Sequence, residues 1–338
     1  MRHKTLAVTV FGIALLALLA ACGGTYNYGT VSFVDADHGW VTGFDPATRQ
    51  TLISSTTDGG ATWSVVGTSQ LGKRSPDRIV GPAAFATATT GVWSTGIDTV
   101  MYTTTGGDPW QAATITGMEG YYFSAMSFAG ASVGWAAACE GAKATAGAIA
   151  KTTDGGATWA AQKKIAAAGG CIDVACPTES VSYVLKDNRR GGVWATTDGG
   201  LTWARHRLPG KSLRPVYFAI DFPSDLTGYA VGSRGKIAKT TDGGMTWIAQ
   251  VSGVRTALRA VCFVDADTGY AVGIKGVILR TQDGGTTWVT QASGTRATFN
   301  SVDFVSSDEG WVVGKAGWAP GQKGFLMHTT DAGQTWTR

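Results

Sequence analysis

Beyond its N-terminal segment, the chain arranges its hydrophobic residues in short runs that are separated by polar turns rich in Gly, Asp and Thr. Runs this short, bounded by such turns, are typical of β-strands. Two landmarks recur: a Phe near the end of one run, and an aromatic residue seven positions later in the next run. The landmark pairs, two of them degraded, are Phe33 and Trp40, Phe85 and Val92, Phe128 and Trp135, Cys176 and Tyr183, Phe222 and Tyr229, Phe263 and Tyr270, and Phe304 and Trp311.

A second motif, close to TTDGGxTW, follows each landmark pair. Its copies end at Trp63, Trp110, Trp159, Trp203, Trp247, Trp288 and Trp336, with spacings of 41 to 49 residues. A period in this range indicates a repeat architecture in which one repeat is the structural unit. Each repeat is predicted to contain a strand, a tight turn, a strand, a loop, a third strand, the TTDGGxTW turn and a fourth strand.

Four short strands cannot bury both faces of a sheet alone, whereas seven such sheets packed radially can. The sequence therefore predicts an all-β, seven-bladed β-propeller with four antiparallel strands per blade. Each blade is expected to be one contiguous repeat, with little or no strand exchange where the ring closes. The expected blades are approximately 30–66, 80–113, 123–162, 172–206, 216–250, 258–291 and 300–338. Composition agrees, since the chain has 48 Gly, 13 Trp and only 15% charged residues.

The TTDGGxTW turn resembles the Asp-box of the bacterial neuraminidase repeat, a hairpin between the third and fourth strands of a blade. Its carboxylate can accept hydrogen bonds from turn N–H groups and a nearby Thr hydroxyl. The second Gly is expected to need a positive φ, and the first Gly, replaced by Ala332 in the last copy, to be less constrained. The second copy has Thr105 and Pro109 at the Asp and Thr positions, so that hairpin is expected to be the weakest. The carboxylates expected to be scaffold are Asp58, Asp154, Asp198, Asp242, Asp283 and Asp331.

The N-terminus has the layout of a targeting segment. Basic residues precede an apolar run over 6–21, which ends in small residues before Cys22. This resembles the bacterial lipoprotein processing site. The prediction is a signal peptide over 1–21, lipid attachment at Cys22 and a flexible leader over 22–29. The propeller would then span 30–338, outside the cytoplasm and tethered to a membrane of the cell envelope.

Metal, disulfide and nucleic-acid chemistry receive little support from the sequence. The four His residues are scattered, and the loops at 35–39 and 265–269 lack the Glu that a calcium loop requires, so no metal or other cofactor is expected. If a disulfide exists, Cys139 and Cys171 are the candidates, and the alternative is four reduced thiols that also include Cys176 and Cys262. Nucleic acid is disfavoured by the compartment and by the lack of interleaved aromatic and basic residues.

Charge is distributed unevenly along the chain. Residues 23–180 contain 8 basic and 12 acidic residues, whereas residues 181–300 contain 15 basic and 8 acidic residues. In a propeller, the connections that leave strands two and four open on one end, so these basic residues should gather on one face. Such a surface suits the carboxylates of a partner or lipid head groups, and the alternative is a solvated rim. The candidate partner-binding residues are Arg207, Lys211, Arg214, Arg234, Arg255, Arg259, Lys275 and Arg296.

The combined pattern VxFxDxxxGYAVGxxGxIxxTxDGGxTW is clearest in residues 261–288 and 218–247. It resembles the photosystem II stability and assembly factor family of plants and cyanobacteria over essentially the whole mature chain. The resemblance implies a non-enzymatic role as an assembly chaperone, in which an Arg-rich face binds a protein partner such as a membrane-protein precursor. A monomer is expected. The second and fourth repeats depart from the pattern, so the resemblance supports a binding and assembly module rather than a photosynthetic role.

The alternative function is an exo-sialidase or another Asp-box glycosidase. Such enzymes need an Arg triad, a Tyr and Glu pair and an acidic proton donor. The chain has only four Glu residues, and the nearest match to the expected Arg-Ile-Pro signature, at 78–80, follows the first Asp-box instead of preceding it. No catalytic residue is therefore assigned. Carboxylates and a Tyr that converge on the central depression would favour the enzyme, and a flat basic face would favour the binding module.

Overall fold

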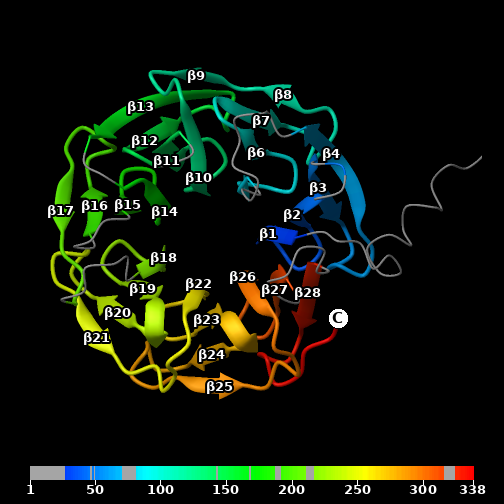
Figure 1. Ribbon diagram of the computed structural model, residues 1–338, viewed down its shortest axis with the longest axis vertical. Helices are drawn as coiled ribbons and strands as arrows, with labels where there is room; N and C mark the ends of the chain where they lie inside the picture. The colour runs from blue at the N-terminus through cyan, green and yellow to red at the C-terminus, as the bar shows by residue number, and fades with distance from the viewer. Residues whose placement is uncertain are drawn as a thin grey trace, which may run out of the picture.

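The protein is a seven-bladed β-propeller in the computed structural model, which describes residues 27–45, 48, 50–70, 81–141, 144–166, 169–186, 192–210, 217–315 and 324–338 (Figure 1). Seven sheets surround a central channel, and the first strand of each sheet is the innermost. The predicted fold class is confirmed. The signal peptide and Cys22 lie outside the described residues.

The strands follow the chain from the inside to the outside of each blade. Blades one to three consist of β1 (Asn27–Phe33), β2 (Gly39–Asp45), β3 (Gln50–Thr56) and β4 (Ser64–Gln70); β5 (Ala83–Phe85), β6 (Gly91–Gly96), β7 (Thr99–Thr103) and β8 (Gln111–Ala112); and β10 (Tyr121–Phe128), β11 (Gly134–Glu140), β12 (Gly147–Thr152) and β13 (Thr158–Ile165). Blades four and five consist of β14 (Cys171–Ala175), β15 (Ser182–Lys186), β16 (Gly192–Thr196) and β17 (Ala204–His206); and β18 (Tyr217–Asp221), β19 (Gly228–Gly232), β20 (Ile237–Thr240) and β21 (Ile248–Gln250). Blades six and seven consist of β22 (Leu258–Phe263), β23 (Gly269–Gly273), β24 (Ile278–Thr281) and β25 (Val289–Gln291); and β26 (Thr298–Phe304), β27 (Gly310–Lys315) and β28 (Gly324–Thr329).

Two details of the sheets depart from a uniform four-strand repeat. In blade seven, the fourth-strand position is represented by a single bridge between His328 and Thr337. In blade three, the short strand β9 (Thr114–Thr116) pairs in parallel with the outermost strand β13 and makes a fifth strand. No sequence pattern marked β9, because this strand precedes the repeat and carries neither landmark. Two 3-10 turns, η1 (Ser233–Gly235) and η2 (Ile274–Gly276), connect the second and third strands of blades five and six.

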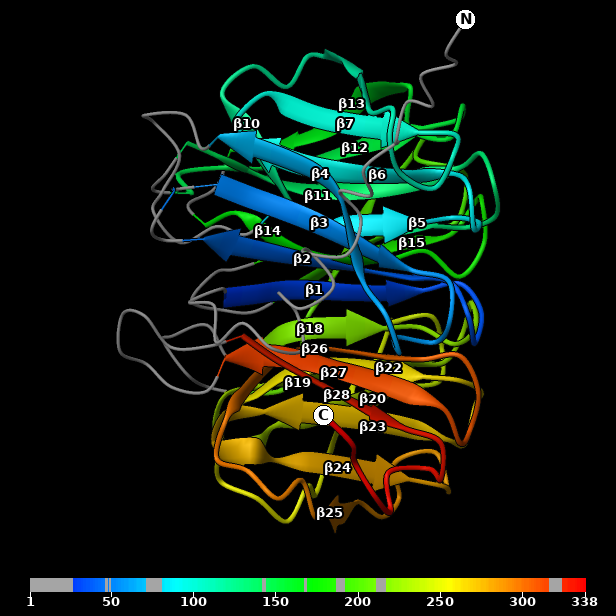
Figure 2. The ribbon, with the colours of Figure 1, turned by 90° about the vertical axis from the view of Figure 1, so that its right-hand side faces the viewer.

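Strand direction gives the propeller two different ends (Figure 2). One end, the loop face, carries the connections from strand two to strand three and from each blade to the next. The other end, the Asp-box face, carries the first turn and the Asp-box of every blade. The first strand β1 starts on the loop face, because Asn27 pairs with Phe44 near the end of β2.

Each intact Asp-box is a closed hydrogen-bonded turn. In the third copy, Asp154 accepts hydrogen bonds from the Thr152 hydroxyl at 2.8 Å, the Thr158 amide at 2.9 Å and the Thr158 hydroxyl at 2.7 Å. Thr152 Oγ1 also accepts from the Gly156 amide at 2.9 Å. The equivalent bonds form around Asp58, Asp198, Asp242, Asp283 and Asp331. These bonds hold the pKa of each carboxyl below its usual value, against the opposing effect of burial.

The glycine predictions are partly wrong. The second Gly has a positive φ in six copies, but in the degraded second copy the positive φ belongs to Gly106 and not to Gly107. The first Gly position is equally constrained, since its φ is positive in every copy, and Ala332 adopts φ 63° there. A side chain at this position is therefore tolerated at a cost and is not free.

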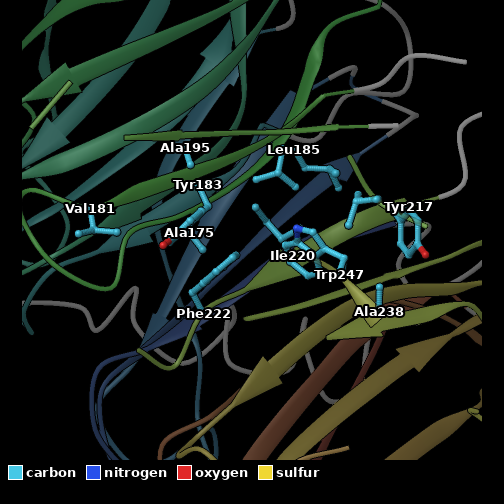
Figure 3. Close-up of a cluster of buried hydrophobic side chains, with 13 residues drawn as sticks. Ala175, Val181, Tyr183, Leu185, Ala195, Tyr217, Ile220, Phe222, Ala238 and Trp247 are labelled. Carbon is cyan, nitrogen blue, oxygen red and sulfur yellow. The ribbon is translucent and has the colours of Figure 1, made fainter. Parts of the chain in front are cut away.

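The two landmarks form the contacts between blades. Tyr229 of blade five stacks on Phe263 of blade six with ring centroids 3.6 Å apart, and Trp288 meets the same Phe edge-on. The same three-ring arrangement joins blade four to blade five through Tyr183, Phe222 and Trp247, inside the buried cluster of Figure 3. Stacked pairs also occur at Trp40 and Phe85, and at Tyr270 and Phe304.

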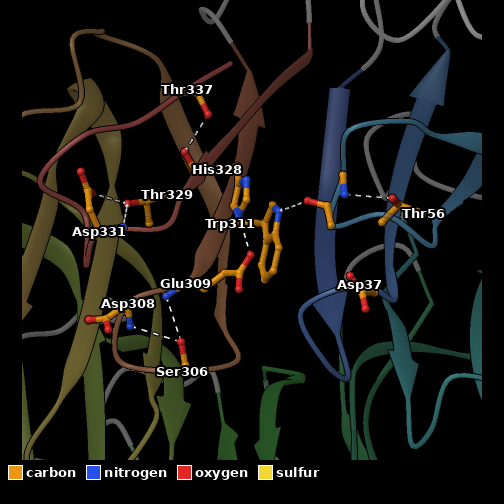
Figure 4. Close-up of polar contacts among 12 residues, drawn as sticks. Asp37, Thr56, Ser306, Asp308, Glu309, Trp311, His328, Thr329, Asp331 and Thr337 are labelled. Atoms are coloured by element: carbon orange, nitrogen blue, oxygen red, sulfur yellow. Dashed lines mark hydrogen bonds and ion pairs between the residues drawn. The ribbon is translucent and has the colours of Figure 1, made fainter.

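The ring closes with the same contact. Trp311 of blade seven stacks on Phe33 of blade one at 3.5 Å, and its indole N–H donates to the Gly59 carbonyl at 3.0 Å. His328 stacks on the other face of Trp311 and contacts Glu309 at 3.1 Å (Figure 4). Closure thus uses side chains and needs no exchanged strand, as expected.

The four cysteines of the propeller are free thiols in the structure. Cys139 and Cys171 are neighbours, as predicted, but the candidate disulfide is not formed. The Cys139 thiol instead donates to the Cys171 carbonyl at 2.9 Å. Burial raises the pKa of Cys171 to about 12, so this thiol stays protonated at neutral pH.

Candidate partner-binding face

A row of basic side chains crosses the loop face from blade four to blade seven. It occupies five successive loops: the connection after β17, the turn η1, the connection after β21, the turn η2 and the connection after β25. We call it the basic strip, and in the described residues it consists of Arg207, Arg234, Lys236, Arg255, Lys275 and Arg296. All are exposed except Lys236, which is half-buried. Among the described residues, no ion pair joins any of the six to a carboxylate.

The five loops touch one another, which makes the strip continuous. Lys236 Nζ approaches Gly210 in the connection from blade four, since a Cβ on Gly210 would lie 3.1 Å from it. Gly235 of η1 packs against the Val254 carbonyl, where a Cβ would come within 2.1 Å. The turn η2 is bonded to both flanking connections, through Ile274 N to Ala257 O at 3.0 Å and Gly276 N to Ala297 O at 2.6 Å.

Blades five and six present the same two-cation unit. In each unit a cation occupies the left-handed position of the 3-10 turn, Arg234 at φ 58° and Lys275 at φ 62°. The second cation, Arg255 or Arg296, ends a Ser-Gly-x-Arg segment whose Ser oxygen accepts from the amide two residues later. A left-handed conformation costs a side-chain-bearing residue about 1 kcal/mol or more, and such strain is found at functional sites.

Three of the predicted partner-binding residues are not included in the basic strip. Lys211 and Arg214 are outside the described residues. The placement of Arg259 in a loop was wrong: it belongs to the inner strand β22 and lines the channel. Strand β22 begins at Leu258 and has a bulge between Leu258 and Ala260. No clear turn signal directly precedes it in the sequence, so its start was not recognised.

Among the described residues of the loop face, the acidic side chains lie away from the basic strip. Exposed Asp98 and Glu119 belong to the loops before blade three, and half-buried Asp45 and Glu140 end the second strands of blades one and three. In this part of the chain, the basic strip over blades four to seven is therefore the surface that attracts an acidic partner.

The central channel encloses about 480 Å³ and is lined by inner strands of all seven blades. Three carboxylates that sequence analysis missed project into it, Asp173, Asp221 and Asp303. Each accepts the amide of the next inner strand: Asp173 from Ile220 at 2.8 Å, Asp221 from Phe263 at 2.6 Å, and Asp303 from Phe33 at 2.6 Å. A signal was present for two of them, since Asp221 and Asp303 directly precede the landmark Phe.

Burial raises the pKa of Asp173 and Asp303 to about 7 and that of Asp221 to about 6, against the lowering effect of the accepted amides. The negative charge of Asp221 raises the pKa of the other two further. The convergence of carboxylates meets one half of the glycosidase criterion. The other half is not met in the described lining, which has no Tyr, no Glu and Arg259 as its single Arg. Because each carboxylate bonds to the neighbouring blade, we assign the three to inter-blade contacts.

The described residues contain no group of His, Cys, Asp and Glu residues that could hold a metal ion. They also contain no helix that is long and apolar enough to cross a membrane.

Comparisons with known proteins agree with the predicted resemblance. Residues 249–338 match the family model described as "Photosynthesis system II assembly factor YCF48". The solved structure "YCF48 bound to D1 peptide" is 20% identical and superposes with a TM-score of 0.67, covering 91% of this chain and 94% of the other. The structure "YCF48 from Cyanidioschyzon merolae" is 18% identical, with a TM-score of 0.65 and coverages of 91% and 96%.

A more general propeller is also similar. "Crystal structure of WD40 beta propeller domain of Doa1" is 12% identical, with a TM-score of 0.58 and coverages of 91% and 93%. No curated protein sequence matches the chain. At these identities the solved structures establish the fold, and the family model supports an assembly factor-like propeller over the last two blades.

Proposed function

Starting from that similarity, we propose that the chain is a non-enzymatic binding and assembly module that captures an acidic segment of a protein partner on its basic strip. The observation that carries the proposal is the pair of matching two-cation units in blades five and six. Guanidinium groups bind carboxylates through paired N–H donors, so a repeated Arg favours a chain that carries several carboxylates. The relative whose structure holds a D1 peptide supports a membrane-protein precursor as partner.

The proposal includes the location of the module. The lipoprotein-like processing site at Cys22 supports attachment to an envelope membrane, with the propeller outside the cytoplasm. Incorporation of labelled fatty acid into the wild-type chain, and its loss in Cys22→Ser, is the expected result. Incorporation that persists in the variant would contradict the attachment site.

The test of the strip is binding of a glutamate-rich peptide to the mature domain, measured by fluorescence anisotropy. The double variant R255A/R296A should weaken binding by up to about thirtyfold, since an exposed ion pair is worth up to about 1 kcal/mol. The matched control is R205A/K164A, which removes two exposed cations from the outer strands β17 and β13. Added salt should weaken the wild-type complex.

Equal binding by both double variants would show that the strip is only a solvated rim. In that case, crosslinking from native membranes would be expected to capture no precursor specifically. Hydrolysis of sialosides and other glycosides would then become the relevant assay.

A further inference from the structure

The start of the propeller lies on the same end as the basic strip. The first described residue, Asn27, begins β1 and pairs with Phe44, next to the connection between β2 and β3. Connections of this type carry Arg234 and Lys275 in blades five and six. Whatever holds the chain by its N-terminus therefore holds it from the loop face.

The predicted lipid-bearing residue is close to this point. Cys22 precedes Asn27 by five residues. A fully extended chain advances at most about 3.6 Å per residue, so this leader reaches about 18 Å. Strand β1 has seven residues, whose six intervals of about 3.3 Å span about 20 Å from the loop face toward the Asp-box face, and the turn that follows Phe33 adds to this length. The leader is too short to run past the blade and let the Asp-box face lie against the bilayer.

We propose that the leader keeps the loop face turned toward the membrane, so that the basic strip recognises acidic segments lying at the bilayer surface. This inference rests on the proposed function for the identity of the ligand and for the lipid attachment at Cys22, and on the structure for the end of the propeller at which β1 starts. Exposed Asp98 and Glu119 on the same face would be repelled by a uniformly anionic lipid surface, whereas an acidic protein segment can bind the basic strip alone, which favours a protein ligand.

Energy transfer from the protein to a labelled lipid head group tests the orientation. Two positions on blade six report on opposite ends: Ala292, exposed just after β25 on the loop face, and Gln282, exposed in the Asp-box. Ala292→Cys and Gln282→Cys in the full lipidated chain would be labelled with a donor, with the unsubstituted chain as the background for the native thiols. Vesicles of neutral phosphatidylcholine with an acceptor on the head group restrict the orienting force to the tether.

We expect greater transfer from the label at Ala292 than from the label at Gln282. Insertion of about twenty Gly and Ser residues after Tyr26 should abolish the difference, because a flexible chain of that length can pass the blade. Three outcomes would overturn the inference. They are equal transfer from the two labels with the natural leader, greater transfer from the label at position 282, and a chain that does not attach to the vesicles.

A capture experiment then tests the class of ligand. A glutamate-rich peptide joined to a lipid by a short spacer should bind the vesicle-attached chain about tenfold more weakly when the leader is lengthened from five to about 25 residues, since effective concentration falls with about the 3/2 power of linker length. The same peptide free in solution should bind both chains equally. If the free peptide binds neither, the proposed function fails while energy transfer still decides the orientation. If the lipid-linked peptide binds both equally, the membrane-surface ligand is refuted although the proposed function stands.

Discussion

Single residues in the Asp-boxes carry most of the local specificity of this fold. One backbone bond joins each of the seven boxes to the first turn of its own blade, such as Gly155 N to Ser132 O at 2.9 Å and Ala332 N to Asp308 O at 2.8 Å. This bond requires a left-handed residue at the first Gly position. Six copies meet the requirement with Gly, and the seventh meets it with Ala332 in the conformation least suited to it.

Replacing Ala332 with Gly should therefore stabilise the protein by about 0.5–1 kcal/mol. The relief of a left-handed Ala is about 1–2 kcal/mol and is partly offset by the greater freedom of Gly in the unfolded chain. Urea denaturation followed by Trp fluorescence measures the change. The matched control is Gly199→Ala, where a Cβ has space, its nearest contact being Lys151 Nζ at 3.4 Å, and only the positive φ opposes the side chain. The account would be wrong if the two substitutions shifted stability in the same direction.

At the scale of elements, the blades are joined by repeated ring contacts. Five of the seven blade interfaces contain a stacked pair at about 3.5 Å. The two that lack one follow Val92 and precede Cys176, the positions where the sequence landmarks were degraded. In the second-copy hairpin, Thr105 takes the Asp position of the motif and bonds to the carbonyls of Gly107 and Asp108, so no carboxylate caps the turn from that position; the relative weakness of this hairpin stays a prediction.

The contact between blades seven and one should depend on Trp311 as strongly as the other stacked interfaces depend on their aromatic residues. Trp311→Ala removes the stack on Phe33 and the bond to Gly59, and large-to-small changes of buried aromatic residues cost about 3–5 kcal/mol. The free energy of unfolding in guanidinium chloride checks this value. Leu201→Ala serves as a control, because Leu201 is 87% exposed and its loss should change stability by less than about 0.5 kcal/mol. Equal, small effects of both substitutions would show that closure is supported mainly by other contacts.

The whole molecule combines two sets of carboxyl groups with opposite pKa shifts. The Asp-box carboxyls have lowered pKa values, so the stability that they add is present above pH 4 and is lost as pH falls further. The channel carboxyls of Asp173, Asp221 and Asp303 have raised pKa values of about 7, 6 and 7. The stability that these three carboxyls contribute is therefore fully present below about pH 4 and is lost as pH rises through their folded-state pKa values.

We therefore expect the free energy of unfolding to be greatest near pH 4 to 5 and to decline toward pH 8. Each channel carboxyl contributes a slope of no more than about 1.4 kcal/mol per pH unit. Asp173→Asn and Asp303→Asn should flatten the decline between pH 5 and 8 without changing the acid limb, whereas Asp154→Asn should change only the acid limb. Denaturation midpoints across this range measure both limbs. An unaltered decline in the channel variants would contradict the assignment.

The sequence by itself determined the number of blades and the order of their strands. Those properties are local: a turn such as TTDGG forms from its own neighbours, and a Phe and an aromatic residue seven positions apart mark the same two places in the repeat. The Asp-boxes could be predicted for the same reason, and the alternating strand direction predicted the side of the ring that carries the basic residues. That the aromatic residue of one blade stacks on the Phe of the next was seen only in the structure.

Only the tertiary structure decided which loops touch and which side chains enter the channel. The order of Arg207, Arg234, Arg255, Lys275 and Arg296 as one continuous strip depends on contacts between loops of different blades, as does the closing stack of Phe33 on Trp311. Arg259 and Asp173 line the channel as members of the inner strands β22 and β14, beside register shifts in those strands that no local pattern marked. Residues far apart in the chain are brought together by ring closure, and that information lies in the packing of the blades and not in any one repeat.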